Sequence, residues 1–560
     1  MNDLVIRDAL IVDGSGDEPV TGDVAVRDGV ITAVGEQGLT GKQLIDGSGL
    51  VLAPGIVDIH THYDAQLTWD ASANPSPQMG VTTVVVGNCG FGLAPCHPDH
   101  RDLTLKNLTK VEGMPLKALL HGVHWNFETF GEYLDVLTAR GVVPNVAAFA
   151  NHSCIRTYVM GTDAAKRPAT PGEIKAIGDL LREALESGAI GLGTSTLESH
   201  NGEGGIPMPS RFACDDEFRE LARVLGEAGR GIFQITKGAA TSIQFIEELA
   251  ELSGRPVQVC PMLQDPGHPT DVFDCMEAYA GAASCGQEIY GQVTPFPEIM
   301  DFNLREPYPL ESLSSWQTAM AASCDEDKMA VFRDPSFRSR VKSELETAGA
   351  PFRFSNQWNT MTIKSKGACE DQVPDERSIA EMAKAQDKHP LDCMLDIALS
   401  ECLETEFTVG MFNAEEDAVT QLLTHERACI GLGDAGAHLT FFCQAGTGLY
   451  LLQRFVRERG DLTLQDAIYR LTRQPAEAMR IGGRGQIRVG GCADLLLFDA
   501  DVVGIGERCM VDDLPGGLER VHTPPLGVHG VWVNGQRVVD ASGSLSEDIQ
   551  PGSVLRQFPT

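Results

Sequence analysis

Eight short apolar segments, most of them rich in β-branched residues, recur along the middle of this chain and alternate with stretches of helical apolar spacing. One such stretch begins at Pro171 and stops at Gly188. Alternating strands and helices predict a parallel sheet with crossover helices. Eight units of this kind predict an α/β fold, a TIM-type (β/α)8 barrel, whose active residues gather at the carboxyl ends of the strands. The predicted strands are residues 56–62, 81–87, 143–152, 189–196, 231–237, 256–263, 288–296 and 428–436.

The two ends of the chain have a different texture, in which β-rich pieces alternate with Asp-Gly, Gly-Ser and Asn-Gly turns. Residues 1–52 include VAVRDGVITAVG, and residues 488–545 include GVWVNGQRVVD. Apolar runs separated by such turns predict β-hairpins. We therefore expect the two ends to pair into one small β-sandwich domain, with the barrel, residues 53–487, inserted between its halves.

One connection between predicted strands is too long for a simple loop. Residues 298–425 separate the seventh and eighth strands and contain pieces with a helical pattern, such as CMLDIALSECLE. Long insertions at a barrel mouth form lids or substrate pockets. A contact between copies of the chain in a homo-oligomer is the alternative, and the sequence leaves both open.

Charge and cysteine usage narrow the function. The 560 residues include 44 Lys and Arg against 78 Asp and Glu, so the net charge is −34. A chain this acidic lacks the basic face that nucleic acid or an anionic membrane requires. No apolar run reaches the ~20 residues of a membrane helix. The 15 cysteines contain no CxxC pair and the N-terminus begins as a strand, not as a basic and then apolar signal. We therefore expect a cytoplasmic protein with reduced thiols.

A pair of histidines stands at the end of the first predicted strand. His60 and His62 are separated by one residue and follow a β-branched run, with Asp64 two residues further on. Residues at i and i+2 of an extended strand point to the same side. The pair can therefore present two imidazoles to one metal ion, and imidazole is a good zinc ligand.

Five segments make the chain resemble the amidohydrolase superfamily over nearly its whole length. Within that superfamily, Asn88-Cys89-Gly90 after the second strand is most similar to the N-acyl-D-amino-acid deacylase branch. The five segments are residues 53–66, 80–95, 430–438, 491–501 and 528–540.

The resemblance implies a metal centre that includes Cys89 and Asp434. In the deacylase branch a cysteine at the place of Cys89 is a metal ligand, and thiolates suit zinc. The aspartate that matches Asp434 binds the metal and takes a proton from its bound water, whose pKa the metal lowers toward ~7. The alternative is that Asp434 only caps the following helix.

The sequence also departs from the family pattern. Much of the superfamily carries a histidine at the end of strand five and another at the end of strand six, whereas this chain has IFQITKG and VQVCPMLQ there. The positions where these ligands would be sought hold Gln234, Thr236, Lys237, Gln258 and Cys260. We therefore expect one zinc per chain, held by His60, His62 and Asp434 with Cys89 in reach. A carboxylated Lys237 that bridges two metals is an alternative.

Other polar residues at strand ends are candidates for binding the substrate. Lys237 could bind a substrate carboxylate or sit in an ion pair. His152 follows strand three and His200 lies in a glycine-rich loop after strand four, so both could face the barrel mouth. His438 stands one helical turn beyond Asp434, which predicts that it supports this aspartate without touching the metal.

These features predict a metal-dependent hydrolase of a non-peptide C–N bond, most simply an N-acyl-D-amino-acid deacylase that acts on a small N-acylated molecule. The D-stereochemistry is implied by the resemblance alone. The alternatives are a cyclic-amide hydrolase of the same superfamily and a barrel that has lost catalysis and binds a small molecule. The chain has no Walker motif, Rossmann fingerprint or G-x-S-x-G elbow.

Overall fold

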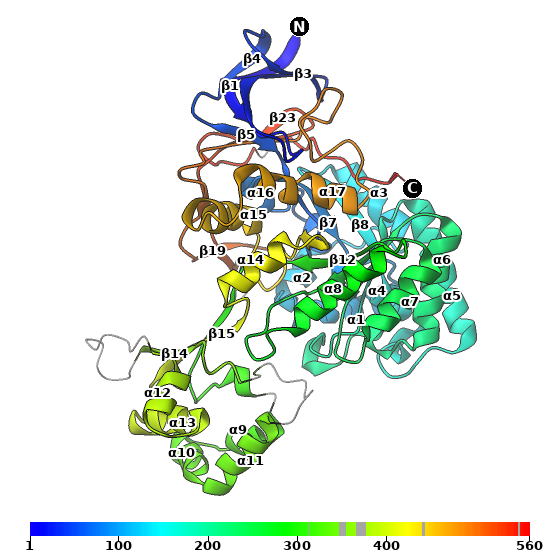
Figure 1. The fold of residues 1–560 in the computed structure, drawn as a ribbon. Coiled ribbons are helices and arrows are strands. Elements are labelled where there is room, and N and C mark those ends of the chain that lie inside the picture. Colours follow the sequence, from blue (N-terminus) through cyan, green and yellow to red (C-terminus); the bar gives the residue numbers. More distant parts are fainter. Residues whose placement is uncertain are drawn as a thin grey trace. The chain divides into compact units, whose positions relative to one another are not determined.

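The computed structural model describes residues 1–311, 313–346, 354, 356–365, 377–439, 443–546 and 549–559. They belong to two compact units (Figure 1). The first comprises Met1–Met262, Met276–Thr294 and Leu423–Thr560, and the second comprises Leu263–Cys275 and Pro295–Leu422. Most of the predicted insertion falls in the second unit, but its residues 312, 347–353, 355 and 366–376 lie outside the described residues.

Eight parallel strands form the centre of the first unit. A parallel bridge between Thr61 and Ala435 joins the continuations of the first and last strands and closes the sheet. All eight predicted strands are present, so the predicted α/β barrel is confirmed. In sheet order the strands are β16 (Ala428–Ile430), β12 (Ile289–Val293), β11 (Val257–Cys260), β10 (Ile232–Thr236), β9 (Gly191–Ser195), β8 (Asn145–Asn151), β7 (Val81–Val86) and β6 (Ile56–Asp58).

Helices connect the strands, as α5 (Pro171–Ser187) illustrates. Thr170 and Glu173 form a capping box at its start, and Gly188 ends it in a left-handed conformation. Among the described residues, no helix is long and apolar enough to cross a membrane. The others that accompany the barrel strands are α1 (Arg101–Asn107), α2 (Leu116–Gly122), α3 (Phe130–Arg140), α4 (His152–Met160), α6 (Asp215–Ala228), α7 (Ile243–Ser253), α8 (Asp271–Ala283), α15 (Thr447–Leu451), α16 (Leu464–Leu471) and α17 (Arg473–Ala478). Most of α14 (Glu416–Thr424) belongs to the second unit.

Both ends of the chain contribute to one eight-stranded sheet, as predicted from their turn-rich texture. β5 from the N-terminal part pairs antiparallel with β17 from the C-terminal part and joins the two halves. The strands are hydrogen-bonded into a single sheet around a core that includes Trp532. They are β23 (Gln536–Val539), β22 (Val528–Val533), β17 (Leu495–Phe498), β5 (Val51–Pro54), β1 (Asn2–Ile11), β2 (Val20–Arg27) and β3 (Val30–Glu36), with β4 (Gly41–Asp46) beside β1.

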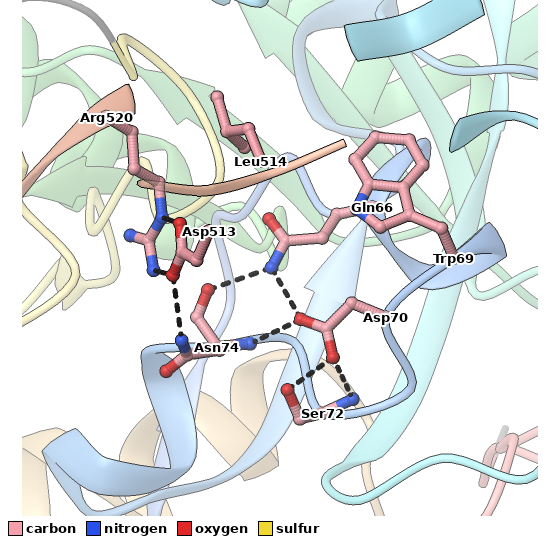
Figure 2. A pocket seen from close by; sticks show the side chains of 8 residues that line it. All are labelled: Gln66, Trp69, Asp70, Ser72, Asn74, Asp513, Leu514 and Arg520. Carbon is pink, nitrogen blue, oxygen red and sulfur yellow. Dashed lines mark hydrogen bonds and ion pairs between the residues drawn. The ribbon is translucent and has the colours of Figure 1, made fainter. Parts of the chain in front are cut away.

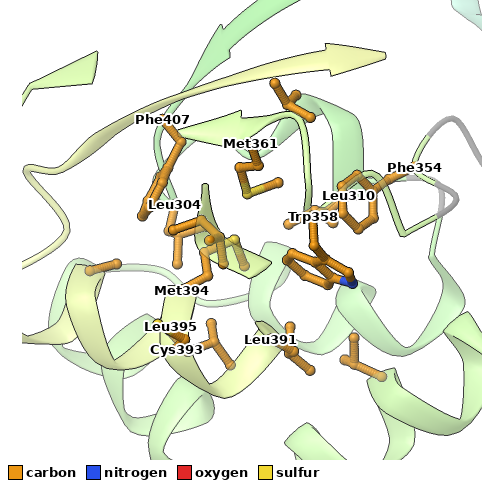
Figure 3. Close-up of a cluster of buried hydrophobic side chains, with 14 of the residues drawn as sticks. Leu304, Leu310, Phe354, Trp358, Met361, Leu391, Cys393, Met394, Leu395 and Phe407 are labelled. Carbon is orange, nitrogen blue, oxygen red and sulfur yellow. The ribbon is translucent and has the colours of Figure 1, made fainter. Parts of the chain in front are cut away.

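The second unit has a hydrophobic core of its own (Figure 3). Trp316, Phe332 and Phe337 are fully buried in it, and Phe407 from the sheet contributes another ring. An independent core explains why this segment forms a separate compact unit. Its antiparallel sheet has the order β13 (Glu298–Phe302), β15 (Glu406–Phe412), β14 (Met361–Ser365), and its helices are α9 (Gln317–Met320), α10 (Asp325–Arg333), α11 (Pro335–Leu345), α12 (Ile379–Ala385) and α13 (Pro390–Ser400).

The sheet built from both ends predicts the effect of removing its central tryptophan. Trp532 is 1% exposed, so Trp532→Ala should destabilise the first unit by about 3–5 kcal/mol, because it loses apolar burial and leaves a cavity. Denaturant unfolding followed by circular dichroism measures this loss. Leu44→Ala, at a 50% exposed position of β4, is the control and should change stability by less than about 0.5 kcal/mol. Equal effects of the two substitutions would contradict the shared core.

Candidate metal centre

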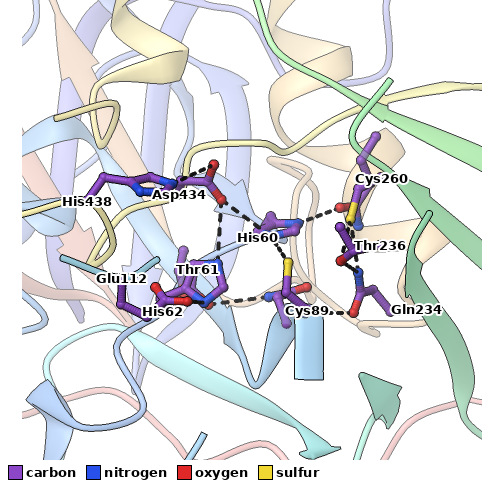
Figure 4. A network of polar contacts seen from close by, with 12 residues as sticks. His60, Thr61, His62, Cys89, Glu112, Gln234, Thr236, Cys260, Asp434 and His438 are labelled. Carbon is purple, nitrogen blue, oxygen red and sulfur yellow. Dashed lines mark hydrogen bonds and ion pairs between the residues drawn. The ribbon is translucent and has the colours of Figure 1, made fainter. Parts of the chain in front are cut away.

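The predicted metal ligands meet at the carboxyl ends of three barrel strands (Figure 4). His60 and His62 follow β6, Cys89 lies in the short turn after β7, and Asp434 lies in the loop after β16. We call these four residues the ligand cluster. The closing bridge explains their meeting, because the backbone N–H of His62 also donates to the carbonyl of Ala435, 2.8 Å away.

The distances within the ligand cluster suit one divalent metal ion. His60 Nε2 lies 3.1 Å from Cys89 Sγ and 3.3 Å from Asp434 Oδ1, and His62 Nε2 lies 3.5 Å from the same oxygen. Ligand atoms of His60, His62 and Cys89 all lie within 4.8 Å of one another. Nitrogen and oxygen ligands of one tetrahedral zinc stand about 3.3–3.5 Å apart. The donor types and the nitrogen–oxygen distances therefore fit zinc, whereas the 3.1 Å contact between His60 Nε2 and Cys89 Sγ has the length of a hydrogen bond.

Each imidazole of the ligand cluster has a polar group behind its other nitrogen. His60 Nδ1 lies 2.6 Å from Gln292 Oε1, and His62 Nδ1 lies 3.4 Å from Glu112 Oε1. Such outer partners fix the orientation and tautomer of metal-binding histidines. Gln292 belongs to a predicted strand, but nothing marked it as functional. Glu112 stands in a polar loop, where a glutamate is usually exposed, so no sequence signal could have singled it out.

The backbone at the site is constrained. Cys89 and Asp434 have φ values of 58° and 40°, in the left-handed region that costs energy for residues other than glycine. Gly433, just before Asp434, has no room for a side chain, since a Cβ there would overlap the carboxylate of Asp58. That carboxylate accepts the backbone N–H of His60 at 3.2 Å. Close packing of Gly433 on Asp58 therefore holds two loops of the ligand cluster together.

Several acidic groups are buried around the ligand cluster. Burial holds the pKa of Glu112 well above its usual range, and the nearby carboxylates of Asp434 and Asp64 raise it further. Burial likewise raises the pKa of Asp64 and that of Asp58 to about 7. Although burial opposes it, the hydrogen bond from His62 and the charge of His60 hold the pKa of Asp434 below its usual range. Raised pKa values favour the neutral forms of Glu112, Asp64 and Asp58, so Asp434 is the carboxylate that stays negative beside the histidines.

The ends of strands five and six carry polar groups that hydrogen-bond with one another. Gln234 Oε1 accepts the backbone N–H of Cys89 at 2.9 Å, and its Nε2 donates to Cys260 Sγ at 3.0 Å. Thr236 Oγ1 lies 3.4 Å from the same sulfur. Although burial raises it, contacts with Cys89 and His60 lower the pKa of Cys260 to about 5. Gln234 is therefore committed to supporting Cys89 and Cys260.

His438, predicted to support Asp434, and His200, predicted to bind the substrate, lie beside the ligand cluster. His438 Nε2 is 3.9 Å from Asp434 Oδ2. His200 is buried, with Nδ1 2.7 Å from Ser195 Oγ and its ring edge-on to Phe91, which also contacts His62. Burial and the neighbouring histidines lower the pKa of His200 to about 3, so its imidazole is neutral.

The other two predicted substrate residues differ in their surroundings. Lys237 follows β10 and is half-buried, and no carboxylate in the described part of the chain forms an ion pair with it. His152 is fully buried at the start of α4, with Nδ1 2.7 Å from Thr194 Oγ1 and Nε2 2.9 Å from Glu217 Oε1. Glu217 also pairs with Arg156. Both ring nitrogens of His152 are therefore engaged by the protein.

A separate pocket of about 220 Å³ lies where the hairpin of β19 (Cys509–Leu514) and β20 (Leu518–His522) meets residues 66–74 (Figure 2). Its charged groups bind one another, since Arg520 forms two 2.6 Å bonds with Asp513 and Asn74 donates to the same carboxylate at 3.2 Å. The backbone N–H of Val521 reaches Leu439, next to His438. The ion pair of Arg520 and Asp513 therefore stabilises the hairpin, and the hydrogen bond of Val521 holds it next to the strand-eight loop.

Comparison with known proteins identifies the family. Residues 43–539 match the family described as "Amidohydrolase family". The chain is an amidohydrolase. N-acyl-D-aspartate deacylase of Alcaligenes xylosoxydans xylosoxydans is 28% identical to it over 563 residues, 99% of this chain and 95% of the relative. D-aminoacylase of the same organism is 27% identical over 541 residues, 96% and 94% of the two chains.

Solved structures share the fold of this amidohydrolase. A crystal structure of D-aminoacylase matches with a TM-score of 0.65 and 23% identity over the full length of both chains. The family match confirms the resemblance to the amidohydrolase superfamily, and the structural match confirms the TIM-type barrel. The protein is a metal-dependent hydrolase of carbon–nitrogen bonds other than peptide bonds.

The packing of Gly433 on Asp58 gives a prediction about the metal centre. Gly433→Ala forces the Asp58 carboxylate away from the His60 N–H and should lower stability by about 1–3 kcal/mol, because overpacking displaces the ligand loops. Zinc affinity should fall with it, as measured by competition with a chelating dye. Gly281→Ala in α8, where a Cβ meets nothing within 4 Å, is the matched control; it should leave zinc affinity unchanged and should not lower stability, because alanine favours the helix. Unaltered zinc affinity in Gly433→Ala would show that this contact does not shape the site.

Proposed function

We propose that this amidohydrolase removes the acyl group from N-acyl-D-amino acids, with one zinc ion held by the ligand cluster. The observation that carries the proposal is the convergence of two imidazoles, a thiol and a carboxylate at the mouth of an amidohydrolase barrel. The substrate class comes from the relatives, which are deacylases of N-acyl-D-aspartate and N-acyl-D-glutamate and a D-aminoacylase, each similar over nearly the whole chain.

The chemistry needs a nucleophile and a proton acceptor at the same place. When bound, zinc supplies a water of lowered pKa and polarises the substrate carbonyl. Asp434 Oδ1 faces the two histidines at 3.3 and 3.5 Å, and Oδ2 lies on the His438 side of the carboxylate. We assign Asp434 the role of base and then acid: it accepts a proton from the attacking water and passes it to the amide nitrogen as the C–N bond breaks. The products are a carboxylate and a free amino acid.

A single zinc fits the groups at the strand ends. A related structure is that of N-acyl-D-glutamate deacylase from Bordetella bronchiseptica, complexed with zinc and a phosphonate inhibitor, at a TM-score of 0.65 and 23% identity over 99% of this chain. Another solved D-aminoacylase has a binuclear metal center, described by one-metal activation and second-metal attenuation. In this chain Gln234 and Thr236 stand where strand five would offer a ligand, and Gln234 is already bonded on both sides. The remaining strong donors suffice for one catalytic zinc.

Lys237 and His200 are the residues that we assign to substrate binding. Lys237 carries a half-buried ammonium at the end of β10 and suits the α-carboxylate of an amino acid. His200 is neutral and adjoins His62 through Phe91, so it can hydrogen-bond the acyl carbonyl. We leave His152 out of this set, because Thr194 and Glu217 occupy both of its ring nitrogens.

We also propose a compartment for the enzyme, the partners that it lacks and a role for its second unit. All fourteen cysteines among the described residues are free of disulfides, which agrees with the reducing cytoplasm. The acidic surface argues against nucleic acid as a partner. We propose that the second unit forms a lid or pocket that selects the substrate. The alternative is that it forms a contact between copies of the chain in a homo-oligomer.

A substrate screen on the zinc-loaded protein tests the function. N-acetyl-D-aspartate, N-acetyl-D-glutamate and N-acetyl-D-leucine are compared with their L-enantiomers and with simple hydantoins, and release of the free amine is followed. We expect turnover of at least one D-substrate and none of the hydantoins. Ring opening of hydantoins would favour the cyclic-amide hydrolase, and zinc binding without any turnover would favour the small-molecule-binding barrel.

Substitutions in the ligand cluster separate metal binding from proton transfer. Asp434→Asn should retain most of the zinc but lose about 10²–10⁴-fold in kcat, because an amide cannot accept the proton. His60→Ala combined with His62→Ala should lose both zinc and activity. Zinc per chain is measured by atomic emission after dialysis. His121→Ala, at an exposed position, is the control and should keep both. Full activity in Asp434→Asn would rule out its role as base.

A further inference from the structure

We propose that Glu112 is a positioning residue of the metal centre, which fixes His62 as a zinc ligand by accepting the hydrogen on its Nδ1. The inference rests on the proposed zinc site and adds a residue to it. Glu112 lies in the loop between α1 and α2, outside every strand end that the barrel fold uses for ligands.

Burial makes Glu112 unusual. Its loop has the sequence LTKVEGMP, in which a charged side chain would ordinarily point to solvent, yet Glu112 is 1% exposed. The structure holds it inward through the main chain as well, since its carbonyl accepts the N–H of Leu439 at 3.3 Å. Leu439 adjoins His438 in the strand-eight loop that carries Asp434. Glu112 therefore links the loops of the first and last strands from behind.

His62 Nδ1 and the Oε1 oxygen of Glu112 lie close to each other inside the protein. His62 Nδ1 and Glu112 Oε2 each lack a hydrogen-bond partner among the described residues, and Nδ1 lies 3.4 Å from Glu112 Oε1. Leaving such atoms unpaired costs about 1–3 kcal/mol each. A shift of a few tenths of an ångström would bring the pair to hydrogen-bond length. A hydrogen bond to Oε1 would therefore give His62 Nδ1 the partner that it lacks.

Metal binding makes this hydrogen bond necessary. An imidazole that offers Nε2 to a metal carries its hydrogen on Nδ1, which must then find an acceptor. His62 Nε2 lies on the Asp434 side of the ring, 3.5 Å from Oδ1, so a zinc-bound His62 would carry its hydrogen on Nδ1. His60 already has a hydrogen bond of this kind, since its Nδ1 lies 2.6 Å from Gln292 Oε1. The two imidazoles are therefore held by a matched pair of outer acceptors, an amide behind one and a carboxyl group behind the other.

Three variants test this role, because acceptor geometry and bulk can be varied separately. Glu112→Gln keeps an acceptor oxygen and should stay within about threefold of the zinc affinity of the unmodified enzyme. Glu112→Leu removes the acceptor but keeps the bulk and should weaken zinc binding by about 10–100-fold, the usual effect of losing an outer partner. Glu132→Leu, which removes an exposed carboxylate of α3, is the control and should leave zinc affinity unchanged.

X-ray absorption of the zinc-loaded proteins gives a second readout, which a general loss of stability would not move. Its outer-shell scattering counts imidazoles on the metal. We expect two in the unmodified enzyme and in Glu112→Gln, and one in Glu112→Leu. Gln292→Leu is the positive comparator and should also lose one imidazole, that of His60.

The outcomes distinguish this inference from the proposed function. Two imidazoles and unchanged affinity in Glu112→Leu would overturn the positioning role and leave the zinc hydrolase intact. Equal weakening in Glu112→Gln and Glu112→Leu would also overturn it, because an acceptor oxygen would then not suffice. If the unmodified enzyme holds no zinc at all, the proposed function fails with it.

Discussion

The closure of the barrel between its first and last strands is the constraint on which the metal centre depends. Thr61 and Ala435 form a parallel bridge, and the N–H of His62 donates to the carbonyl of Ala435. The same closure packs Gly433 against Asp58, which in turn holds the backbone of His60. His60 and Asp434, far apart in the sequence, are thereby fixed 3.3 Å from each other. Without this closure the histidines and the aspartate would belong to separate loops.

Charge balance gives the site its chemical character. Glu112, Asp64 and Asp58 are buried near two histidines and burial raises their pKa values, whereas Asp434 is partly exposed and its pKa is lowered. Gln292 and Gln234 add neutral amides that orient His60 and Cys89 without adding further charge. The barrel therefore offers a divalent ion the carboxylate of Asp434 together with directed nitrogen and sulfur donors. Such a site can place a metal, a nucleophilic water and a proton acceptor together, as amide hydrolysis requires.

The sequence predicted the barrel well because the spacing of its apolar residues indicates which side chains are buried. All eight strands were found, since each is apolar and bounded by turns, and the pairing of the two chain ends followed from their hairpin texture. The candidate ligands His60 and His62 were named from their spacing at a strand end, and Cys89 and Asp434 from the resemblance to the amidohydrolase superfamily. Glu112 and Gln292 could not be, because their importance comes from what they face in space. His152 was proposed as a substrate residue because it follows a strand, but its side chain lies in a buried network with Glu217 and Arg156. The extent of the second unit was also hard to predict. Residues 263–275 belong to it although a segment of the first unit separates them from the rest of it in the sequence, and no local sequence pattern indicates this.

The central claim is that one zinc ion sits among four residues from three strand ends. Anomalous diffraction at the zinc edge, from crystals of the zinc-loaded protein, tests it most directly. The account predicts one strong anomalous peak per chain, about 2.0–2.3 Å from His60 Nε2, His62 Nε2, Cys89 Sγ and an oxygen of Asp434. Two strong peaks of equal height, or a single peak bound by other residues, would contradict it.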